Sequence, residues 1–368
     1  MKVLALASYP VEAAATRYRL AQFVEPLAAR GINLDVRPFL DARLFASLYR
    51  RNQLPRVAFG LFAAALRRVA DTAAARSAEV LLVQREAMLF GPPVVEWLTA
   101  QLGKRPLVLD LDDATYVSYT SPTYGRAGSW LKWFSKTDDL IGWARIVTCG
   151  NRSIAEYVES KGGHARIIPT VVDTERFRPR ARAQEGGASG PPVLGWIGTH
   201  STFPYLESIF PALQELARAH EFKLKIVGSG RADVRLAGVE VENLDWNLER
   251  EIADFQSFDI GLYPIDAALY ADKWAAGKSG FKAIQYMAVG IPYLATPVGA
   301  SAEIGAEGVT HFSASTLEEW SARLRLLLTD EERRRAMGEA GRRHALEHYT
   351  VPQQADKLAA ALREAAGR

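Results

Sequence analysis

The amino-acid sequence predicts an α/β protein of two doubly wound domains, each with a parallel sheet between helices, that face each other across a cleft. Its 368 residues exceed what one compact domain usually holds. Short apolar, β-branched runs alternate with helical patterns, which is typical of parallel sheets wrapped by helices. The alternation stops at residues 179–192, which are rich in Gly, Pro and Ser. We therefore expect a domain at 1–178, a linker at 179–192 and a second domain at 193–350.

The first domain is expected to contain a strand wherever a short apolar run is bounded by turn residues. These strands cover residues 2–8, 32–37, 79–84, 107–112, 145–149 and 165–169. Apolar residues three and four apart predict helices between them. These helices cover residues 17–30, 92–102 and 151–160.

The second domain repeats the pattern. Its expected strands cover residues 193–197, 223–227, 239–244, 260–263, 293–296 and 309–312. From residue 317 onward the apolar spacing is helical. The last segment, 351–368, is expected to be a separate helix that could pack back on the first domain.

Composition restricts the classes of function. Apolar residues make up 48% and charged residues 24% of the chain, as in a soluble globular enzyme. A net charge of +3 is too small to suggest nucleic-acid binding. Cys149 is the single cysteine, so an intrachain disulfide is excluded and a reducing, cytoplasmic location is expected. The apolar segment 1–7 is interpreted as a core strand, and the apolar run 57–66 is shorter than the roughly 20 residues that span a bilayer.

Residues 42–78 form a locally basic stretch. Seven arginines stand against one acid, Asp71, and are interleaved with leucine, phenylalanine and valine. This composition is typical of a helix that lies on an anionic membrane surface, and also of an ordinary amphipathic surface helix. The first interpretation predicts a peripheral protein on the inner face of the membrane.

Two familiar nucleotide motifs are missing. Ser-Tyr-Pro-Val-Glu-Ala follows the first strand at residues 8–13, where a Gly-x-Gly-x-x-Gly fingerprint would indicate a dinucleotide cofactor. A Gly-x-x-x-x-Gly-Lys-Ser/Thr loop is missing as well. Dehydrogenases and the common nucleotide hydrolases are therefore disfavoured, and no cofactor is expected.

Glycine turns follow two strands of the second domain. Gly198, Thr199 and His200 come after the first strand, and Gly228 and Ser229 come after the second. Ligands gather at the carboxyl ends of parallel strands, where backbone amides can meet a phosphate. The same residues would also serve as plain strand-to-loop turns.

A stronger phosphate signal lies at residues 274–292. A turn with Lys278, Ser279 and Gly280 opens a helix that carries Lys282 and Gln285. A diphosphate at this helix start would meet free amides, the positive end of the dipole and one or both ammonium groups. Gln285 lies one turn beyond Lys282 and could bind ribose hydroxyls. The alternative is a capped helix with solvated lysines.

The same stretch resembles a known family. Residues 286–292, Tyr-Met-Ala-Val-Gly-Ile-Pro, and residues 167–179 are similar to segments of the family-four retaining glycosyltransferases, also called group 1, which have the GT-B architecture. Gly277 and Gln285 stand where that family has two acids, which suggests a variant branch. The resemblance implies transfer of a hexosyl group from a nucleoside diphosphate sugar, with retention, in polysaccharide or glycolipid assembly.

Carboxylates cluster at the end of the strand 107–112, where Asp110, Asp112 and Asp113 follow one another closely. Burial of charge is costly unless the groups are paired or functional. The resembled family has His-Asp at the last two positions, so Asp112 and Asp113 are the catalytic candidates that would stabilise the oxocarbenium charge or orient the acceptor. Loop capping or a pair with Arg85 remains the structural alternative. Asp-Leu-Asp also looks like a metal-binding triplet, but a lysine-rich diphosphate site needs no divalent ion.

Acceptor-binding candidates follow the first and third strands. Arg17 and Arg19 could hold an anionic, lipid-linked acceptor, and Arg85 and Glu86 lie at the same sheet edge. Solvated helix charges would give the same pattern. Two rival functions remain open: a nucleotide-sugar epimerase or phosphorylase on the same architecture, and a catalytically inactive nucleotide-sugar-binding protein.

Overall fold

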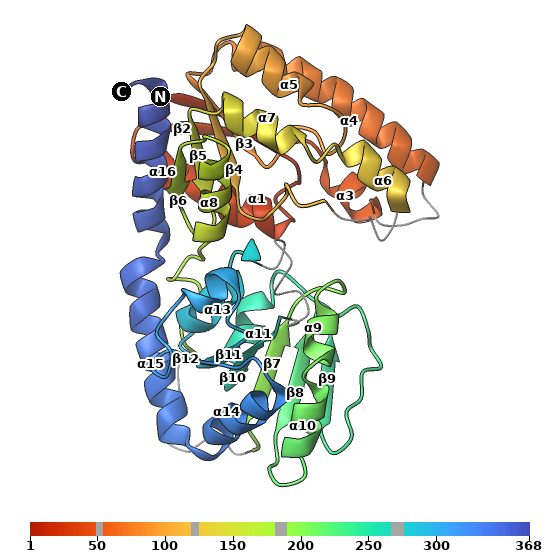
Figure 1. Cartoon of the computed structure of the whole chain (residues 1–368), viewed down its shortest axis with the longest axis vertical. Helices are drawn as coiled ribbons and strands as arrows, with labels where there is room; N and C mark the ends of the chain where they lie inside the picture. Colours follow the sequence, from red (N-terminus) through yellow and green to blue (C-terminus); the bar gives the residue numbers. More distant parts are fainter. Residues whose placement is uncertain (49–53, 119–124, 181–189, 266–275) are drawn as a thin grey trace. The chain divides into compact units, whose positions relative to one another are not determined.

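The computed structural model describes residues 1–48, 54–118, 125–180, 190–265 and 276–368. The chain forms two compact units (Figure 1). Unit 1 comprises residues 1–170, 277–279 and 351–368, and unit 2 comprises residues 171–276 and 280–350.

Unit 1 is built on a parallel sheet in the order β2-β1-β3-β4-β5-β6. Its strands are β1 Lys2–Ala7, β2 Asn33–Pro38, β3 Val80–Gln84, β4 Leu107–Leu111, β5 Ile146–Cys149 and β6 Ala165–Ile167. Every residue of β3, β4 and β5 is buried, because helices cover both faces of these central strands. Each predicted strand of this domain is present at or close to its predicted bounds.

The helices of unit 1 fill the connections between these strands. They are α1 Ala14–Arg19, η1 Ala21–Phe23, α2 Val24–Ala28, α3 Ala42–Ser47, α4 Leu54–Ala75, α5 Val94–Glu96, η3 Trp97–Leu102, α6 Gly125–Lys132, α7 Lys136–Trp143 and α8 Arg152–Ser160. The helix predicted at 17–30 is broken into α1, η1 and α2. Pro26 explains the break, because proline lacks an N–H and its ring clashes with the carbonyl four residues earlier. In α2 it lies in the first turn, where no backbone donor is needed.

The last helix, α16 Val351–Ala366, belongs to unit 1. It packs on α2 and on β3, β4 and β5, and the two ends of the chain lie close together in Figure 1. Arg30 contacts Asp356 at 2.7 Å, and Arg145 Nη1 donates to the carbonyl of Ala365 at 2.8 Å. Its buried face is rich in alanine, which lets the helix approach the sheet closely.

Unit 2 contains the second parallel sheet, in the order β12-β11-β10-β7-β8-β9. Its strands are β7 Val193–Ile197, β8 Lys223–Val227, β9 Glu240–Leu244, β10 Ile260–Tyr263, β11 Tyr293–Ala295 and β12 His311–Ser313. Its helices are α9 Phe203–Glu207, α10 Phe210–Leu216, α11 Glu251–Gln256, α13 Phe281–Ala288, η5 Gly299–Ala302, α14 Leu317–Thr329 and α15 Glu331–His348. The predicted α/β class with two parallel sheets is confirmed.

The first boundary lies earlier than the predicted residue 178. Residues 171–178 group with unit 2 because Arg342 of α15 binds their backbone, with Nη1 donating to Phe177 O at 2.8 Å and Nη2 donating to Thr174 O at 2.9 Å. Phe177 also packs against the ring of Phe255. Residues 181–189 of the predicted linker lie outside the described residues.

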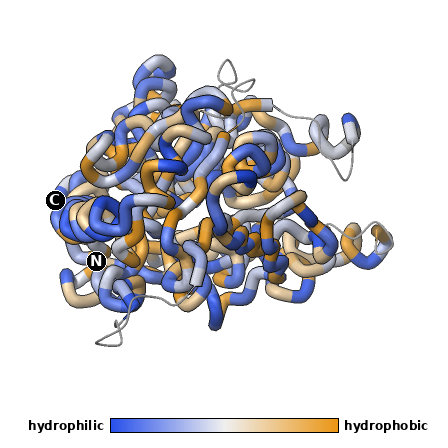
Figure 2. Tube along the Cα trace, turned by 90° about the horizontal axis from the view of Figure 1, so that it is seen from below, coloured by the Kyte–Doolittle hydropathy of each residue, from blue (hydrophilic) through white to orange (hydrophobic). Residues whose placement is uncertain are grey.

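Polar and apolar residues alternate along the helical parts of the trace (Figure 2). Among the described residues, no helix is both long enough and apolar enough to cross a membrane.

Candidate functional site

The carboxylate cluster lies where the sequence predicts it, at the carboxyl end of β4, but each acid has a different environment. Asp110 is a buried strand residue. Arg19 of α1 grips both of its carboxylate oxygens, with Nε at 3.0 Å from Oδ2, and Thr148 Oγ1 donates to it at 2.6 Å. Arg19 Nη1 also donates to Ile168 O at 2.5 Å. Arg19, an acceptor candidate, is therefore buried and joins α1, β4 and the end of β6.

Asp112 is held by Arg85, as the structural alternative predicted. Arg85 Nε donates to Asp112 Oδ1 at 2.6 Å and Nη2 donates to Oδ2 at 2.7 Å, which is the two-pronged geometry of a strong arginine–carboxylate pair. Arg85 has φ of 62°, a left-handed conformation that turns its side chain toward β4. Burial alone would raise the pKa of Asp112, but the Arg85 guanidinium outweighs burial and holds the pKa below its usual range.

Asp113 is the least neutralised of the three acids. Its Oδ2 lies 4.0 Å from Arg85 Nη2, and 23% of its side chain is exposed. Burial raises the pKa of Asp113 above its usual range, although the charges of Lys278 and Arg85 act in the opposite direction. A raised pKa with a partly exposed carboxyl is typical of a functional acid.

Lys278 comes to this cluster from far along the chain. Residues 277–279 group with unit 1. Asn151 Nδ2 donates to Lys278 O at 2.9 Å. A Cβ on Gly277 would lie 2.3 Å from Ala114 Cβ, so this position has no room for the acid that the resembled family carries. The sequence predicted Lys278 and Asp113 as parts of separate domains, and no local pattern signals that they lie near each other.

The other acceptor candidates have internal partners. Both carboxylate oxygens of Glu86 contact lysines: Oε1 contacts Lys132, and Oε2 lies 2.6 Å from Lys136 Nζ. Burial would raise the pKa of Glu86, but the two ammonium groups hold it below its usual range. Arg17 Nη1 donates to the carbonyl of Glu12 at 3.1 Å.

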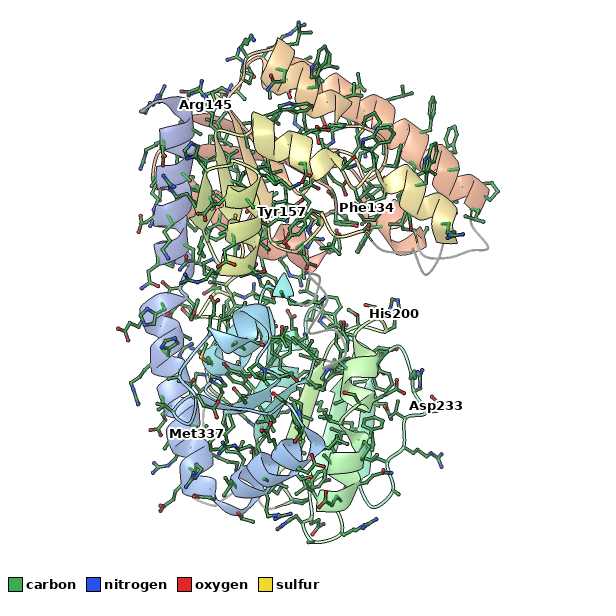
Figure 3. All side chains as sticks on the ribbon, viewed as in Figure 1. Phe134, Arg145, Tyr157, His200, Asp233 and Met337 are labelled. Atoms are coloured by element: carbon green, nitrogen blue, oxygen red, sulfur yellow. The ribbon has the colours of Figure 1, made fainter. Side chains whose placement is uncertain are left out.

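In unit 2, the two glycine turns predicted for the donor lie next to each other, because β7 and β8 are neighbours in the sheet. Gly228 has φ of 81°, and a Cβ there would lie 2.4 Å from Gly198 O. Both turns therefore need glycine so that their backbones can pass this closely. Thr199 and His200, which follow Gly198, are exposed, and Figure 3 labels His200.

The remaining donor candidates differ in exposure. Ser229 is buried, and its Oγ accepts from the backbone N–H of Arg231 at 3.1 Å. Gly280, with φ of 64°, caps the start of α13, where a Cβ would meet Ile304. Ser279 and Lys282 are half-buried. Gln285 is only 2% exposed and lies on the buried face of α13.

Two further glycines of unit 2 have a packing role that the sequence did not reveal. A Cβ on Gly195 would lie 2.0 Å from the ring of Phe258, and one on Gly261 would lie 2.5 Å from the ring of Tyr286. Tyr286 Oη donates to Leu262 O at 3.0 Å. These aromatic side chains anchor α13 on the sheet, which positions the start of this helix.

Comparisons with known proteins agree with this architecture. The model of a family described as glycosyl transferase-like matches residues 211–360. A D-inositol 3-phosphate glycosyltransferase from Segniliparus rotundus is 27% identical over 256 residues, which are 61% of this chain and 55% of the relative. The chain thus spans about half the length of this curated relative.

Solved structures share the fold over nearly the whole chain. Sucrose-phosphate synthase from Thermosynechococcus elongatus superposes with a TM-score of 0.69 at 16% identity and covers 99% of this chain and 98% of that one. Anabaena HepE in complex with UDP-glucose superposes with a TM-score of 0.67 at 16% identity and covers 99% of this chain and 100% of that one. Taken together, the family match and the curated relative show that the chain is similar to glycosyltransferases, and the solved structures confirm the predicted GT-B fold.

Proposed function

We propose that the protein transfers a sugar from a nucleoside diphosphate sugar to a glycan or lipid-linked acceptor, with retention of the anomeric configuration. The observation that carries this proposal is the proximity of Lys278 and Asp113. The residues next to them pack closely, since a Cβ on Gly277 would lie 2.3 Å from Ala114 Cβ, and the charge of Lys278 acts to lower the pKa of Asp113. Only Ser279 separates this lysine from Gly280, which caps α13. A cation for a diphosphate and a carboxylate for a developing positive charge thus belong to one site.

The donor's diphosphate binds at the start of α13. The positive end of the helix dipole favours an anion there, and Lys278 and Lys282 add two ammonium groups. The turns at Gly198 and Gly228 expose further backbone groups at the carboxyl edge of the sheet of unit 2. Gln285 lies on the buried face of α13. We therefore assign it a structural role in this helix instead of the ribose contact that the sequence suggested.

Asp113 and Asp112 have different roles in the proposed mechanism. Asp113 is the carboxylate that faces the developing oxocarbenium charge, because it keeps an exposed edge. Asp112 is a positioning residue, since Arg85 occupies both of its oxygens. Arg19 and Glu86 hold the strand ends in place through their buried ion pairs, whereas Arg17 and Arg85 remain the candidates for acceptor binding.

The mechanism we propose uses no divalent metal. Asp110 and Asp112 would be the natural metal ligands, but each already faces a guanidinium that neutralises its charge. A carboxylate in such a pair is a weak ligand for a hard cation, since the cation would have to displace the arginine. The lysines of the diphosphate site supply the positive charge instead.

A thermal-shift titration with nucleoside diphosphate sugars tests the donor site. UDP-glucose is the first ligand to try, because the similar Anabaena structure holds UDP-glucose. We expect a rise in melting temperature that Lys278→Ala with Lys282→Ala abolishes. Lys357→Ala, an exposed lysine on α16, is the matched control and should keep the shift. Retention of the full shift in the double variant would refute this placement of the phosphates.

A transfer assay separates sugar transfer from the rival functions. The missing acid at Gly277 favours a donor-binding protein without turnover as the alternative. Donor binding with no transfer to any acceptor extract would support that alternative. Interconversion of donor sugars without an acceptor would support an epimerase.

A further inference from the structure

Helix α4 exposes an apolar face to solvent. Phe59 is 74% exposed, Phe62 61%, Leu66 59% and Val69 45%. Their spacing of three and four residues puts these side chains on one stripe of the helix. Figure 1 shows α4 as a long helix at the outer edge of unit 1. A contiguous exposed stripe of this kind marks an interaction surface rather than a core element.

The opposite face of α4 packs against the sheet side of unit 1 and includes a buried arginine, Arg68. Arg68 is 1% exposed and donates to the carbonyls of Ala7 and Arg37 at 2.9 and 3.0 Å. It also binds Asp71 Oδ2 at 3.0 Å. Val57 and Ala64 of the same helix are buried in the core, so α4 has an apolar inner face besides the exposed apolar stripe, whereas a surface helix usually exposes a polar face.

The exposed charges on α3, on α4 and just after α4 have one sign. Asp71 is the one acid between residues 42 and 78, and it pairs inward with Arg37 and Arg68. Arg43, Arg56, Arg67 and Arg76 are exposed. Anionic partners would be attracted at both ends of the stripe.

A second apolar group lies on α6 and just after it. Trp130 is 74% exposed, Leu131 51% and Trp133 43%. The lysine among them, Lys132, turns inward to Glu86. The backbone N–H of Gly91 donates to Leu131 O at 2.8 Å, and the neighbouring Leu89 and Phe90 pack in the same apolar cluster as α4.

We propose that unit 1 docks on an anionic lipid bilayer through the outer face of α4, with Phe59 and Phe62 inserted among the lipid tails. The exposed arginines face the head groups, and Trp130 and Trp133 extend the contact, as amphipathic indole rings favour the bilayer interface. The one-signed charge favours an anionic bilayer over a second copy of this chain, which would bring the same positive charges together. This inference goes beyond the proposed function and does not depend on it.

Vesicle flotation of the full chain tests the proposal. We expect binding to phosphatidylcholine vesicles that contain about 30% phosphatidylglycerol, little binding to phosphatidylcholine alone, and a loss of binding as salt screens the arginines. Phe59→Ser with Phe62→Ser should weaken binding at least about tenfold, because two phenyl groups no longer leave water. Val309→Ser with Leu346→Ser, at other exposed apolar positions in unit 2, should bind as the unchanged chain does.

A second pair of variants guards against a folding defect. Arg43→Glu with Arg56→Glu changes only exposed side chains and should abolish the preference for anionic vesicles. Binding that is unchanged in both the Phe and the Arg variants would overturn the proposal, as would failure of the unchanged chain to float with anionic vesicles. Dimerisation in solution that Phe59→Ser with Phe62→Ser abolishes would assign the face to a second copy instead.

Discussion

At the scale of single residues, loss of charge at the neighbouring acids Asp113 and Asp112 is predicted to have different effects on the stability of the protein. Asp113→Asn should lower the rate of sugar transfer by about 100-fold or more, because a carboxylate that faces developing positive charge is lost. It should leave stability unchanged or slightly higher. The pKa of Asp113 is raised, so the ionised carboxylate is less stable in the fold than in the unfolded chain, and a neutral amide relieves that cost. Steady-state kinetics and thermal unfolding of one preparation check both expectations.

Asp112→Asn provides the contrast. Its pKa is lowered, so the ionised form stabilises the fold above the usual pKa of an aspartate, and this stability is lost as pH falls through the lowered value. The amide leaves the half-buried Arg85 guanidinium with only Asp113, at 4.0 Å, as a counter-charge, which should cost about 3 kcal/mol of unfolding free energy. A destabilised Asp113→Asn beside a fully stable Asp112→Asn would reverse our assignment of the two roles.

The sequence predicts where the acids lie but only part of their surroundings. The local sequence pattern predicts that β4 is buried and where it ends. The pair of Arg85 with Asp112 was also among the alternatives that the sequence predicted. The pair of Arg19 with Asp110 joins residues 91 positions apart, and Lys278 reaches Asp113 from still farther along the chain. Such contacts depend on the arrangement of the strands and on how the chain returns to unit 1, which a single sequence does not encode locally.

At the scale of elements, the glycines under α13 are predicted to be sensitive to a single methyl group. Gly195→Ala and Gly261→Ala would each drive a Cβ into an aromatic ring of unit 2. Overpacking of this kind costs about 1–3 kcal/mol, and we expect the start of α13 to shift and donor binding to weaken. Gly142→Ala in α7 is the control, since a Cβ there meets nothing within 4 Å and alanine favours a helix by about 0.5–1 kcal/mol. Chemical denaturation should show a lower free energy of unfolding for Gly195→Ala and Gly261→Ala and a higher one for Gly142→Ala. Equal stability of all three variants would contradict the packing argument.

The elements themselves are largely predictable from sequence. Strands of both sheets were expected near their observed positions because central parallel strands are continuously apolar and bounded by turns. The helix predicted at 17–30 is interrupted instead, because Pro26 disfavours a continuous helix through the turn before it. The orientation of α4 could not be predicted, because Arg68 lies on the inner face and the periodicity of apolar residues alone does not tell the inner stripe from the outer one.

At the scale of the whole molecule, the chain leaves unit 1, builds unit 2 and returns to unit 1 with α16. The stability of the first sheet is therefore predicted to depend on the last residues of the chain. Leu362 is fully buried, and α16 covers β3, β4 and β5. Leu362→Ala should cost about 2–5 kcal/mol through the cavity that it leaves. Amide hydrogen exchange should then accelerate in β3–β5 while β7 and β8 keep their protection. Leu346→Ala, on the exposed face of α15, should change neither sheet. Faster exchange in the sheet of unit 2 alone would mean that α16 stabilises the other unit, and the division of the chain would have to be redrawn.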